Sequence, residues 1–368
     1  MKLKDEPAFI NRNKDMSFLK EWISRRPGQI LFLFGPKSSG KTTLLYRFFN
    51  NSIEMQHYEV KFINLRKILI ANYKDFLRIF FGHDESKEKS DLKETKEYNL
   101  KIFKLKVEAL KGLKQKKLDP FAIMEKELEK IVQKGRIPII VVDELQALEN
   151  IYMNGQKELL KELFNFFVSI TKESHLAHVI ISSSDGFFIE RIYSDSRLSK
   201  TSQFREIDYL PKADIEYWLN NLKKESNLDL ILTKEQIECI WNYFGGSVWE
   251  VRHFLTLLDI ISENNHVKTQ DIENEALKEI KAAKVRFTEY PSLYFHDDLF
   301  LIIEETLKSK DYIVLEDFTK KFDRKKVHEE LGNLVSHNIF SYNPTTGEYK
   351  PQGHSMRLGL SWYCKDCV

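Results

Sequence analysis

The chain has little cysteine, and its thiols do not form a disulfide pattern. Among 368 residues there are only three, Cys239, Cys364 and Cys367. This small number argues against the disulfide framework of a small secreted domain. Cys364 and Cys367 have the CxxC spacing of half a zinc or redox site, but a structural zinc ion needs four ligands and the sequence has no second pair. We expect these two residues to lie on a solvent-exposed tail.

Long apolar runs and an excess of charge of one sign are also missing. The longest apolar stretches have the length of strands, and the N-terminal residues MKLKDEPAF lack the apolar core of a signal peptide. We therefore expect a cytoplasmic protein without a membrane-spanning helix. The 57 Lys and Arg residues nearly balance the 55 Asp and Glu residues. Any contact with nucleic acid then has to come from a local basic patch rather than from the net charge.

Glycine is scarce too, with 14 residues, yet two glycines frame the most informative motif. The run ILFLFGPKSSGKTTLL, residues 30–45, places five apolar residues before a GxxxxGK[ST] spacing and an apolar, helix-like segment after it. In such a phosphate loop the glycines let backbone N–H groups turn toward phosphates, Lys41 supplies a positive charge, and the Thr42 hydroxyl can bind Mg²⁺. The predicted nucleotide-binding residues are Gly35, Pro36, Lys37, Ser38, Ser39, Gly40, Lys41, Thr42 and Thr43.

A second motif ends in two adjacent carboxylates. Residues 136–144, RIPIIVVDE, form a β-branched run typical of a parallel strand that is buried on both faces. In a P-loop ATPase, Asp143 would hold Mg²⁺ through the water shell of the ion, and Glu144 would polarise the attacking water. The alternative is an acidic strand end without a catalytic role. The phosphate loop upstream favours the ATPase interpretation.

The order of apolar patterns predicts an α/β fold followed by two further regions. Strands are expected at about residues 30–34, 58–65, 136–144, 178–184 and 203–210, with helices between them, which is the pattern of a parallel sheet covered by helices. We predict a P-loop ATPase core at 1–210 with a helical insertion at about 71–134, a helical lid at 211–290, and a winged-helix domain at 291–368. Thr233 and Thr269 are expected to cap helices of the lid.

The last region shows three helical segments and a hairpin, which is the order of a winged helix. Its third helix, expected at 324–336, begins with Arg324, Lys325 and Lys326. Basic residues at a helix N-terminus would reach DNA phosphates or base edges. Two glutamates follow directly, at 329 and 330, and they favour a protein contact or a regulatory role. A DNA partner and a protein partner both stay open on this evidence.

Together these segments resemble the archaeal ATPase family, in the STAND branch of AAA+-related P-loop ATPases. The resemblance rests on PAFINRNKDMSFLKEW at 7–22, FLFGPKSSGKTTLL at 32–45 and IIVVDELQAL at 139–148, and it continues through YFGGSVWEVRHFL at 243–255. It implies that ATP and Mg²⁺ are the ligands and that ATP hydrolysis is the activity. It also implies a homo-oligomer in which one subunit presents an arginine to its neighbour.

The resemblance implies roles for individual residues outside the two motifs. Arg12 would line the adenine or ribose side together with Phe9, although Phe9 could instead staple the first helix. Ser183 would hydrogen-bond the γ-phosphate or the attacking water, or simply cap the next helix. Arg197 would be the arginine finger, or it would form a surface ion pair with Asp195. The predicted catalytic set is therefore Lys41, Glu144, Ser183 and Arg197.

Two functions follow from these features. The first is a Mg²⁺-dependent ATPase that works as a conformational switch, in which ATP holds the lid and the winged helix closed on the core and hydrolysis or exchange releases them. The second is a DNA-binding regulator or a replication-initiator-like protein in which ATP locks one conformation.

Overall fold

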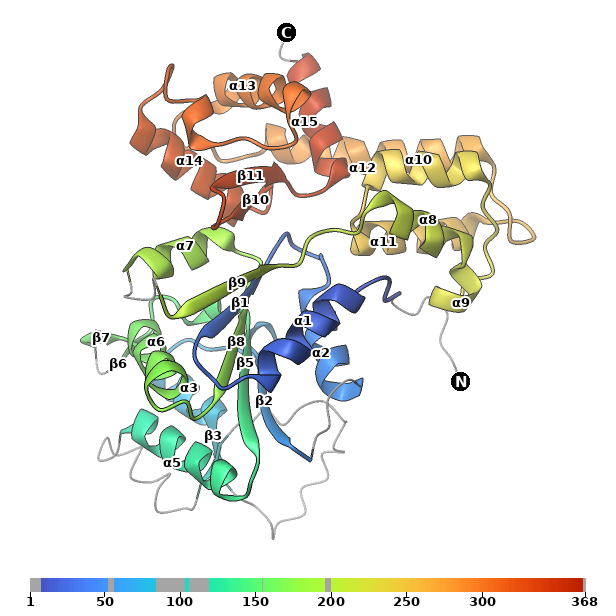
Figure 1. Ribbon diagram of the computed structural model, residues 1–368. Helices are drawn as coiled ribbons and strands as arrows, with labels where there is room; N and C mark the ends of the chain where they lie inside the picture. Colours follow the sequence, from blue (N-terminus) through green and yellow to red (C-terminus); the bar gives the residue numbers. More distant parts are fainter. Residues whose placement is uncertain are drawn as a thin grey trace.

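A five-stranded parallel sheet forms the centre of the N-terminal part of the chain (Figure 1). The computed structural model describes residues 8–51, 56–83, 103–105, 119–153, 155–195 and 200–366. The strands are β1 (Ile30–Phe34), β2 (Tyr58–Asn64), β5 (Ile137–Asp143), β8 (His178–Ser182) and β9 (Ser202–Glu206). They stand in the order β2-β5-β8-β1-β9, and every neighbouring pair is parallel. The expected α/β fold is confirmed.

The strand register brings both sequence motifs to one edge of the sheet. Asn64 of β2 lies opposite Asp143 of β5, and Asp143 lies opposite Ser182 of β8. β1 ends at Phe34, directly before the expected phosphate loop. In parallel sheets of this kind, ligands bind outside the carboxyl ends of the strands. The acidic pair and the loop are therefore placed side by side by the fold.

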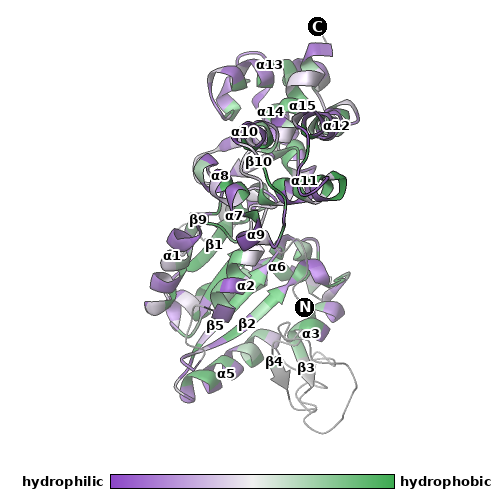
Figure 2. Cartoon of the chain, turned by 90° about the vertical axis from the view of Figure 1, so that its right-hand side faces the viewer, coloured by the Kyte–Doolittle hydropathy of each residue, from purple (hydrophilic) through white to green (hydrophobic). Residues whose placement is uncertain are grey.

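Two helical layers cover the sheet. On one face α1 (Asn13–Ser24) and α2 (Lys41–Asn51) pack against Leu31 and Leu33 of β1. The other face, which holds Ile30, Phe32 and Phe34, is covered by α3 (Tyr73–Phe80), α5 (Pro120–Gln133), α6 (Leu159–Val168) and α7 (Gly186–Asp195). Alternate residues of β1 thus enter different apolar layers, which is why the whole strand is hydrophobic. Figure 2 shows the hydrophobic strands between the helices.

The insertion expected at 71–134 is only partly helical. α3 and α5 confirm its two ends as helices. Between them, however, β3 (Phe81–His83) pairs in parallel with β4 (Phe103–Leu105), within a stretch expected to be helical. Phe81 and Phe103 are both buried, with ring centroids 5.9 Å apart. Burial of this aromatic pair outweighs the helical pattern of the charged residues around it.

Short elements complete the core. They are 3-10 turns at Leu65–Lys67 and Leu145–Leu148, the hairpin of β6 (Tyr152–Met153) and β7 (Lys157–Glu158), and a wide turn at Ser169–Glu173 that prolongs α6.

Five helices follow the sheet, as expected for the lid. They are α8 (Lys212–Asn220), α9 (Leu222–Ser226), α10 (Lys234–Phe244), α11 (Val248–Ile261) and α12 (Thr269–Thr288). Thr233 caps α10, because its hydroxyl accepts a hydrogen bond from Gln236 N at 3.3 Å. The expectation for Thr269 was wrong: Lys268 holds the cap position and Thr269 is the first helical residue. The Thr269 hydroxyl instead accepts from Gln236 Nε2 at 3.4 Å.

A twin-glycine turn connects the lid to the end of the core. Gly245 ends α10 with a φ of +55°, in the left-handed region that favours glycine. A Cβ on Gly246 would stand 1.9 Å from the carbonyl oxygen of Leu210. Leu210 N also donates to Gly246 O at 3.0 Å. A backbone hydrogen bond therefore connects Leu210, just before α8, to Gly246, just before α11.

The C-terminal part confirms the expected winged-helix order. Its elements are α13 (His296–Ser309), a 3-10 turn at Leu315–Asp317, α14 (Arg324–Ser336), β10 (Phe340–Asn343), β11 (Glu348–Pro351) and α15 (His354–Asp366). Three apolar residues on one face of α14, Val327, Leu331 and Leu334, are fully buried. No helix among the described residues is long and apolar enough to cross a membrane.

The last helix corrects the expectation of an exposed cysteine tail. Cys364 lies on α15, is 5% exposed, and donates its Sγ–H to Phe300 O at 3.5 Å. Met356, Leu360 and Tyr363 of the same helix are buried with it. The chain after the hairpin therefore continues the core of this domain, because these residues recur on one helical face. Cys367 lies outside the described residues.

Candidate functional site: the phosphate-loop pocket

The phosphate loop uses its two glycines where no other residue fits well. Gly35 has a φ of +144°, and a Cβ there would stand 2.2 Å from the carbonyl oxygen of Ile207. Gly40 has a φ of +93°, again a conformation that residues with a Cβ rarely adopt. α2 begins at the next residue, Lys41, and Leu44 N donates to Gly40 O at 2.8 Å. The N-terminus of α2, with its positive dipole end, therefore opens at the loop.

Lys41 is held inside the curl of this loop. It is 5% exposed, and its Nζ donates to Gly35 O and Pro36 O, each at 2.9 Å. Burial lowers the pKa of its ammonium group to about 8, although the neighbouring carboxylates of Glu144 and Asp143 favour the charged form. A buried cation held by neutral carbonyl oxygens is well suited to pair with a phosphate anion.

Asp143 has the unsatisfied oxygen that a metal site requires. Its Oδ2 accepts from the Thr42 hydroxyl at 2.8 Å and from Asn64 Nδ2 at 3.2 Å. Its Oδ1 is buried and has no hydrogen-bond partner among the described residues. A buried carboxylate oxygen without a partner is costly. Oxygen ligands of this kind are the ones that Mg²⁺ prefers, so the residues present fit this ion.

Glu144 stands at the start of a tight turn with both oxygens occupied. Its backbone has a φ of +63°, and its side chain is directed at the pocket edge by Arg66, whose guanidinium donates to Oε1. Gln146 donates to Oε2, and the Ser184 hydroxyl lies 3.5 Å from Oε1. Only 8% of Glu144 is exposed. The carboxylate is thus ordered at the pocket but paired with a cation.

Ser183 lies next to this pair without reaching the pocket wall. Its hydroxyl donates to Gln146 Oε1 at 3.0 Å and accepts from Asp185 N at 3.0 Å. The second contact belongs to the turn before α7, but the cap of that helix is Asp185, whose Oδ1 accepts from Phe188 N at 2.9 Å. Ser184, one residue further, lines the pocket instead.

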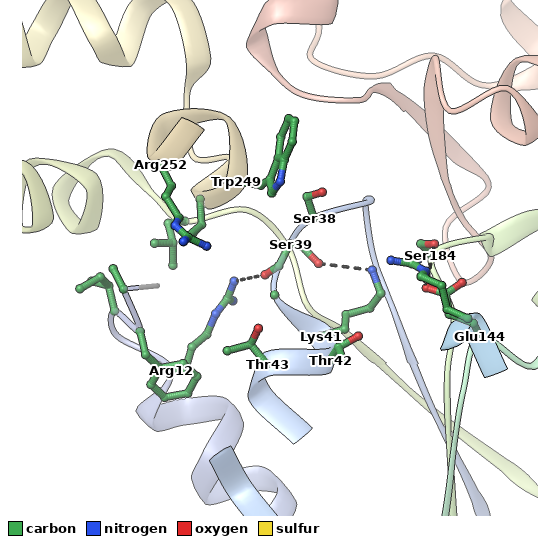
Figure 3. A pocket seen from close by; sticks show the side chains of 17 residues that line it. Arg12, Ser38, Ser39, Lys41, Thr42, Thr43, Glu144, Ser184, Trp249 and Arg252 are labelled. Carbon is green, nitrogen blue, oxygen red and sulfur yellow. Dashed lines mark hydrogen bonds and ion pairs between the residues drawn. The ribbon is translucent and has the colours of Figure 1, made fainter. Parts of the chain in front are cut away.

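The pocket opens between the loop, the N-terminal segment and the lid (Figure 3). Arg12 joins two of these walls, because its Nη2 donates to Ser39 O at 2.6 Å and to Asp208 O at 2.9 Å. Phe9 packs under the Arg47 guanidinium, 4.6 Å from Cζ to the ring centroid. The apolar lining comes from Ala8, Phe9, Ile10, Leu210, Val248 and Trp249, and Arg252 adds a cation on the lid side.

The family is decided by a match over most of this chain. Residues 9–254 match a family described as an ATPase domain predominantly from Archaea. The chain belongs to this family. It is 34% identical over 347 residues to an uncharacterized ATP-binding protein of Methanocaldococcus jannaschii, with 93% of this chain and 95% of that protein covered. A second uncharacterized ATP-binding protein of the same organism is 36% identical over 342 residues, covering 84% and 98%.

The fold of this family member is also found in a solved structure. The ORC2 protein of Aeropyrum pernix, solved as ADPNP–ADP complexes, superposes with a TM-score of 0.54, covering 100% of this chain and 97% of that one. The identity is 13%, so the likeness concerns the fold. The ADP form of the same protein gives a TM-score of 0.53.

The structure does not bring every predicted residue to the pocket. The lining includes Ser38, Ser39, Gly40, Lys41, Thr42, Thr43 and Arg12, but not Gly35, Pro36 or Lys37. Gly35 packs on Ile207, and Gly35 and Pro36 hold Lys41 through their carbonyl oxygens. Arg197 lies outside the described residues, and its role stays a prediction.

Sequence reasoning missed several pocket residues of this family member. Arg66, the partner of Glu144, comes from the turn after β2. Its signal was present, since polar residues that follow neighbouring parallel strands meet at one edge. Trp249 is 58% exposed at the lid side of the pocket, with its ring stacked on His253 at 5.5 Å. An exposed tryptophan at the start of a helix is the signal that could have found it.

Proposed function

We propose that this protein binds ATP with Mg²⁺ in the phosphate-loop pocket and hydrolyses the β–γ bond. The observation that carries the proposal is the unpartnered Oδ1 of Asp143, which lies in one cluster with the Thr42 hydroxyl and the buried ammonium group of Lys41. Family membership over residues 9–254 supports it. The two relatives named above carry the description ATP-binding protein.

Each residue of the pocket has a separate role in this proposal. Lys41 and the amides at the start of α2 bind the phosphates, and Thr42 with Asp143 would hold Mg²⁺, which supplies charge neutralisation for the departing phosphate. Glu144 accepts the proton of the attacking water. Arg66 and Gln146 each donate to one Glu144 oxygen, and each carboxylate oxygen has a second lone pair with which to accept from the water.

The same proposal includes a conformational switch between the core and the two regions that follow it. We place the boundaries at residues 210 and 290. This division is supported by separate apolar clusters, one that gathers Leu210 to Ala276 with two N-terminal residues, and one that runs from Phe287 to Cys364. Nucleotide touches the lid through Trp249 and Arg252 in this proposal, so its binding would favour one position of the lid. Action of Arg197 on a neighbouring subunit is part of the proposal only if the protein forms oligomers.

The test separates binding from turnover with two substitutions. Lys41→Ala removes the buried cation and is expected to abolish ATP binding measured by calorimetry. Glu144→Gln is expected to keep the ATP affinity and to lower phosphate release by about a hundredfold or more, the contribution usual for a general base. Lys20→Ala, on the exposed side of α1, is the matched control. If folded Lys41→Ala protein binds ATP with unchanged affinity, the proposal is wrong.

DNA binding is the second candidate, and one surface favours it. The exposed residues Lys320, Lys321, Arg324, Lys325 and Lys326 gather at the start of α14. Against it, His328 and Gly332 on the next turns of α14 lie against Phe187 of the core. A duplex titration from low to high salt tests this candidate, since phosphate contacts give a steep salt dependence. An affinity unchanged in a Lys325→Ala and Lys326→Ala double variant would reject this surface.

A further inference from the structure

The outer side of the phosphate loop is held by a residue from the far end of the chain. Lys37 N donates to Gln352 Oε1 at 3.0 Å, across 315 positions of sequence. The carbonyl oxygen of the same Lys37 accepts from the Tyr209 hydroxyl, also at 3.0 Å. Both backbone groups of Lys37 are therefore engaged, and Lys37 itself does not line the pocket.

Contacts within the C-terminal domain hold Gln352 in place, in addition to its contact with the loop. It is 8% exposed and follows β11 directly; its backbone N donates to Ile339 O at 2.9 Å, and its Nε2 donates to Phe340 O at 3.2 Å. The carbonyl oxygen of Phe340 can only accept, and the N–H of Lys37 can only donate. These two partners set the orientation of the Gln352 amide, and the Tyr209 hydroxyl also donates to its Oε1 at 3.3 Å. A flexible surface glutamine would not be constrained in this way.

Close packing of the hairpin on α7 brings Gln352 to the loop. A Cβ on Gly186 would stand 1.9 Å from the carbonyl oxygen of Tyr342, so the backbone of β10 lies directly on the start of α7. The ring of Phe187 sits 5.5 Å from the Tyr342 ring and 4.9 Å from His328. In Figure 1 the hairpin of β10 and β11 lies over α7. The position of Gln352 thus depends on this contact.

We propose that Gln352 is a positioning residue of the nucleotide site. It holds the apex of the phosphate loop at Lys37, so that residues 38–43 keep the conformation that lines the pocket, and it does so only while the C-terminal domain is docked. Docking and nucleotide binding are then linked, and by reciprocity a bound nucleotide strengthens docking by the same factor that docking strengthens binding. This inference rests on the proposed function, because it assigns a control to the same site.

The first measurement is nucleotide affinity. Calorimetry with MgATP and MgADP on Gln352→Ala is expected to show a dissociation constant raised about three- to tenfold, the size of one neutral hydrogen bond. Ser341→Ala, which removes only a contact inside the hairpin from its hydroxyl to Lys350 O, is the control and is expected to match the wild type. If the wild type itself binds neither nucleotide, the proposed function fails. If it binds and Gln352→Ala binds equally well, this inference alone fails.

The second measurement separates positioning from a general loss of stability. Hydrogen exchange of residues 340–352 is followed with and without MgADP. Nucleotide is expected to slow exchange there in the wild type and to have no effect there in Gln352→Ala. Without nucleotide, exchange of the Lys37 amide is expected to be faster in Gln352→Ala than in the wild type, because that amide loses its acceptor. Equal nucleotide effects on residues 340–352 in the wild type and Gln352→Ala would overturn the proposal.

The third measurement moves the hairpin without touching Gln352. Gly186→Ala forces β10 away from α7, and it is expected to weaken nucleotide binding by a factor similar to that of Gln352→Ala. The double variant is expected to be no worse than either single one, since both act through one contact. Multiplicative losses in the double variant would contradict the proposal, because they would mean that docking reaches the pocket by another route.

Discussion

Two buried carboxylates in this molecule have opposite surroundings. Glu330 of α14 is fully buried, and its oxygens accept from Tyr290 Oη at 2.8 Å, Leu293 N at 3.0 Å and Tyr294 N at 2.7 Å, with a further contact to Ser292 Oγ at 3.2 Å. Asp143 is 1% exposed and uses one oxygen for two donors, whereas its other oxygen has no partner among the described residues.

This difference teaches how to separate a structural acid from a functional one. Burial alone does not distinguish them, because both side chains are removed from water to the same degree. Glu330 joins α14 to the segment before α13, so its hydrogen bonds stabilise the fold. Asp143 retains an unsatisfied oxygen beside the pocket, which stabilises nothing until a ligand arrives. The unmet hydrogen-bonding capacity is therefore the better indicator of function.

The largest effect is expected from removing Glu330. In Glu330→Ala, the buried Tyr290 hydroxyl and the N–H groups of Leu293 and Tyr294 lose their shared acceptor, so the C-terminal domain is expected to lose about 4 kcal/mol of unfolding free energy. Urea unfolding followed by hydrogen exchange in α13 and α14 measures it. Glu329→Ala, at the exposed neighbouring position, is the control. A loss under about 1 kcal/mol would mean that these hydrogen bonds are replaced by water.

The opposite behaviour is expected at Asp143. Asp143→Asn removes a buried charge whose Oδ1 has no partner, so unfolding free energy is expected to stay within about 1 kcal/mol of the wild type. Mg²⁺-dependent ATP turnover is expected to fall about a hundredfold, because the proposed function gives this carboxylate the task of holding Mg²⁺. Turnover is titrated against Mg²⁺ concentration. Wild-type turnover in this variant, or a stability loss as large as that of Glu330→Ala, would make Asp143 a structural acid.

Glu250 is a third buried carboxylate, and it extends the comparison of Glu330 with Asp143. Ser355 donates to its Oε1, while its Oε2 is buried without a partner among the described residues. Burial raises the pKa of this carboxyl from 4.5 to about 7, with Glu279 adding to the rise, while hydrogen bonds from Ser355 and Ser247 and the charge of Arg286 oppose it.

The raised pKa of Glu250 determines whether the unfolding free energy rises or falls with pH. Between pH 4.5 and about 7 the folded state holds a proton at Glu250 that the unfolded chain has released, so stability falls as pH rises through this window. The expected loss is about 2 kcal/mol, and Glu250→Gln is expected to flatten it. Thermal unfolding from pH 5 to pH 8 is the measurement. A pH slope unchanged by the substitution would exclude Glu250 as its source.

The smallest effect on stability is expected for an ion pair whose two side chains are both exposed to solvent. Arg324 Nη2 lies 3.2 Å from Glu316 Oε1, but each side chain is 64% exposed. Glu316→Ala is therefore expected to change the unfolding free energy by no more than about 0.5 kcal/mol. The same urea series measures it. A loss comparable with that of Glu330→Ala would show that exposure is a poor guide to the strength of such pairs.

Local patterns explain what the sequence could predict. The phosphate loop, Asp143 and the strand that carries it are short motifs whose geometry depends on neighbouring residues, and β1, β5 and β8 have strong apolar runs. Phe103 was misread because the lysines around it favour a helix, whereas its burial is decided by Phe81. The burial of Cys364 had a readable signal in the apolar spacing of α15.

Contacts between distant segments explain what it could not predict. Gln352 meets Lys37 across 315 positions. No periodicity or spacing in a single sequence encodes such a meeting, because it depends on how separate elements pack. Gln352 follows a short strand and precedes a glycine, so by itself it resembles any residue of a turn.

The bond between Leu210 and Gly246 closes a loop of the chain. Since Leu210 N donates to Gly246 O, the excursion that contains α8, α9 and α10 leaves and rejoins the chain at one point. These three helices also share one apolar cluster with α11 and α12. The start of α11, which carries Trp249 and Arg252 to the pocket, is therefore anchored to the end of the core twice, by a backbone hydrogen bond and by common packing.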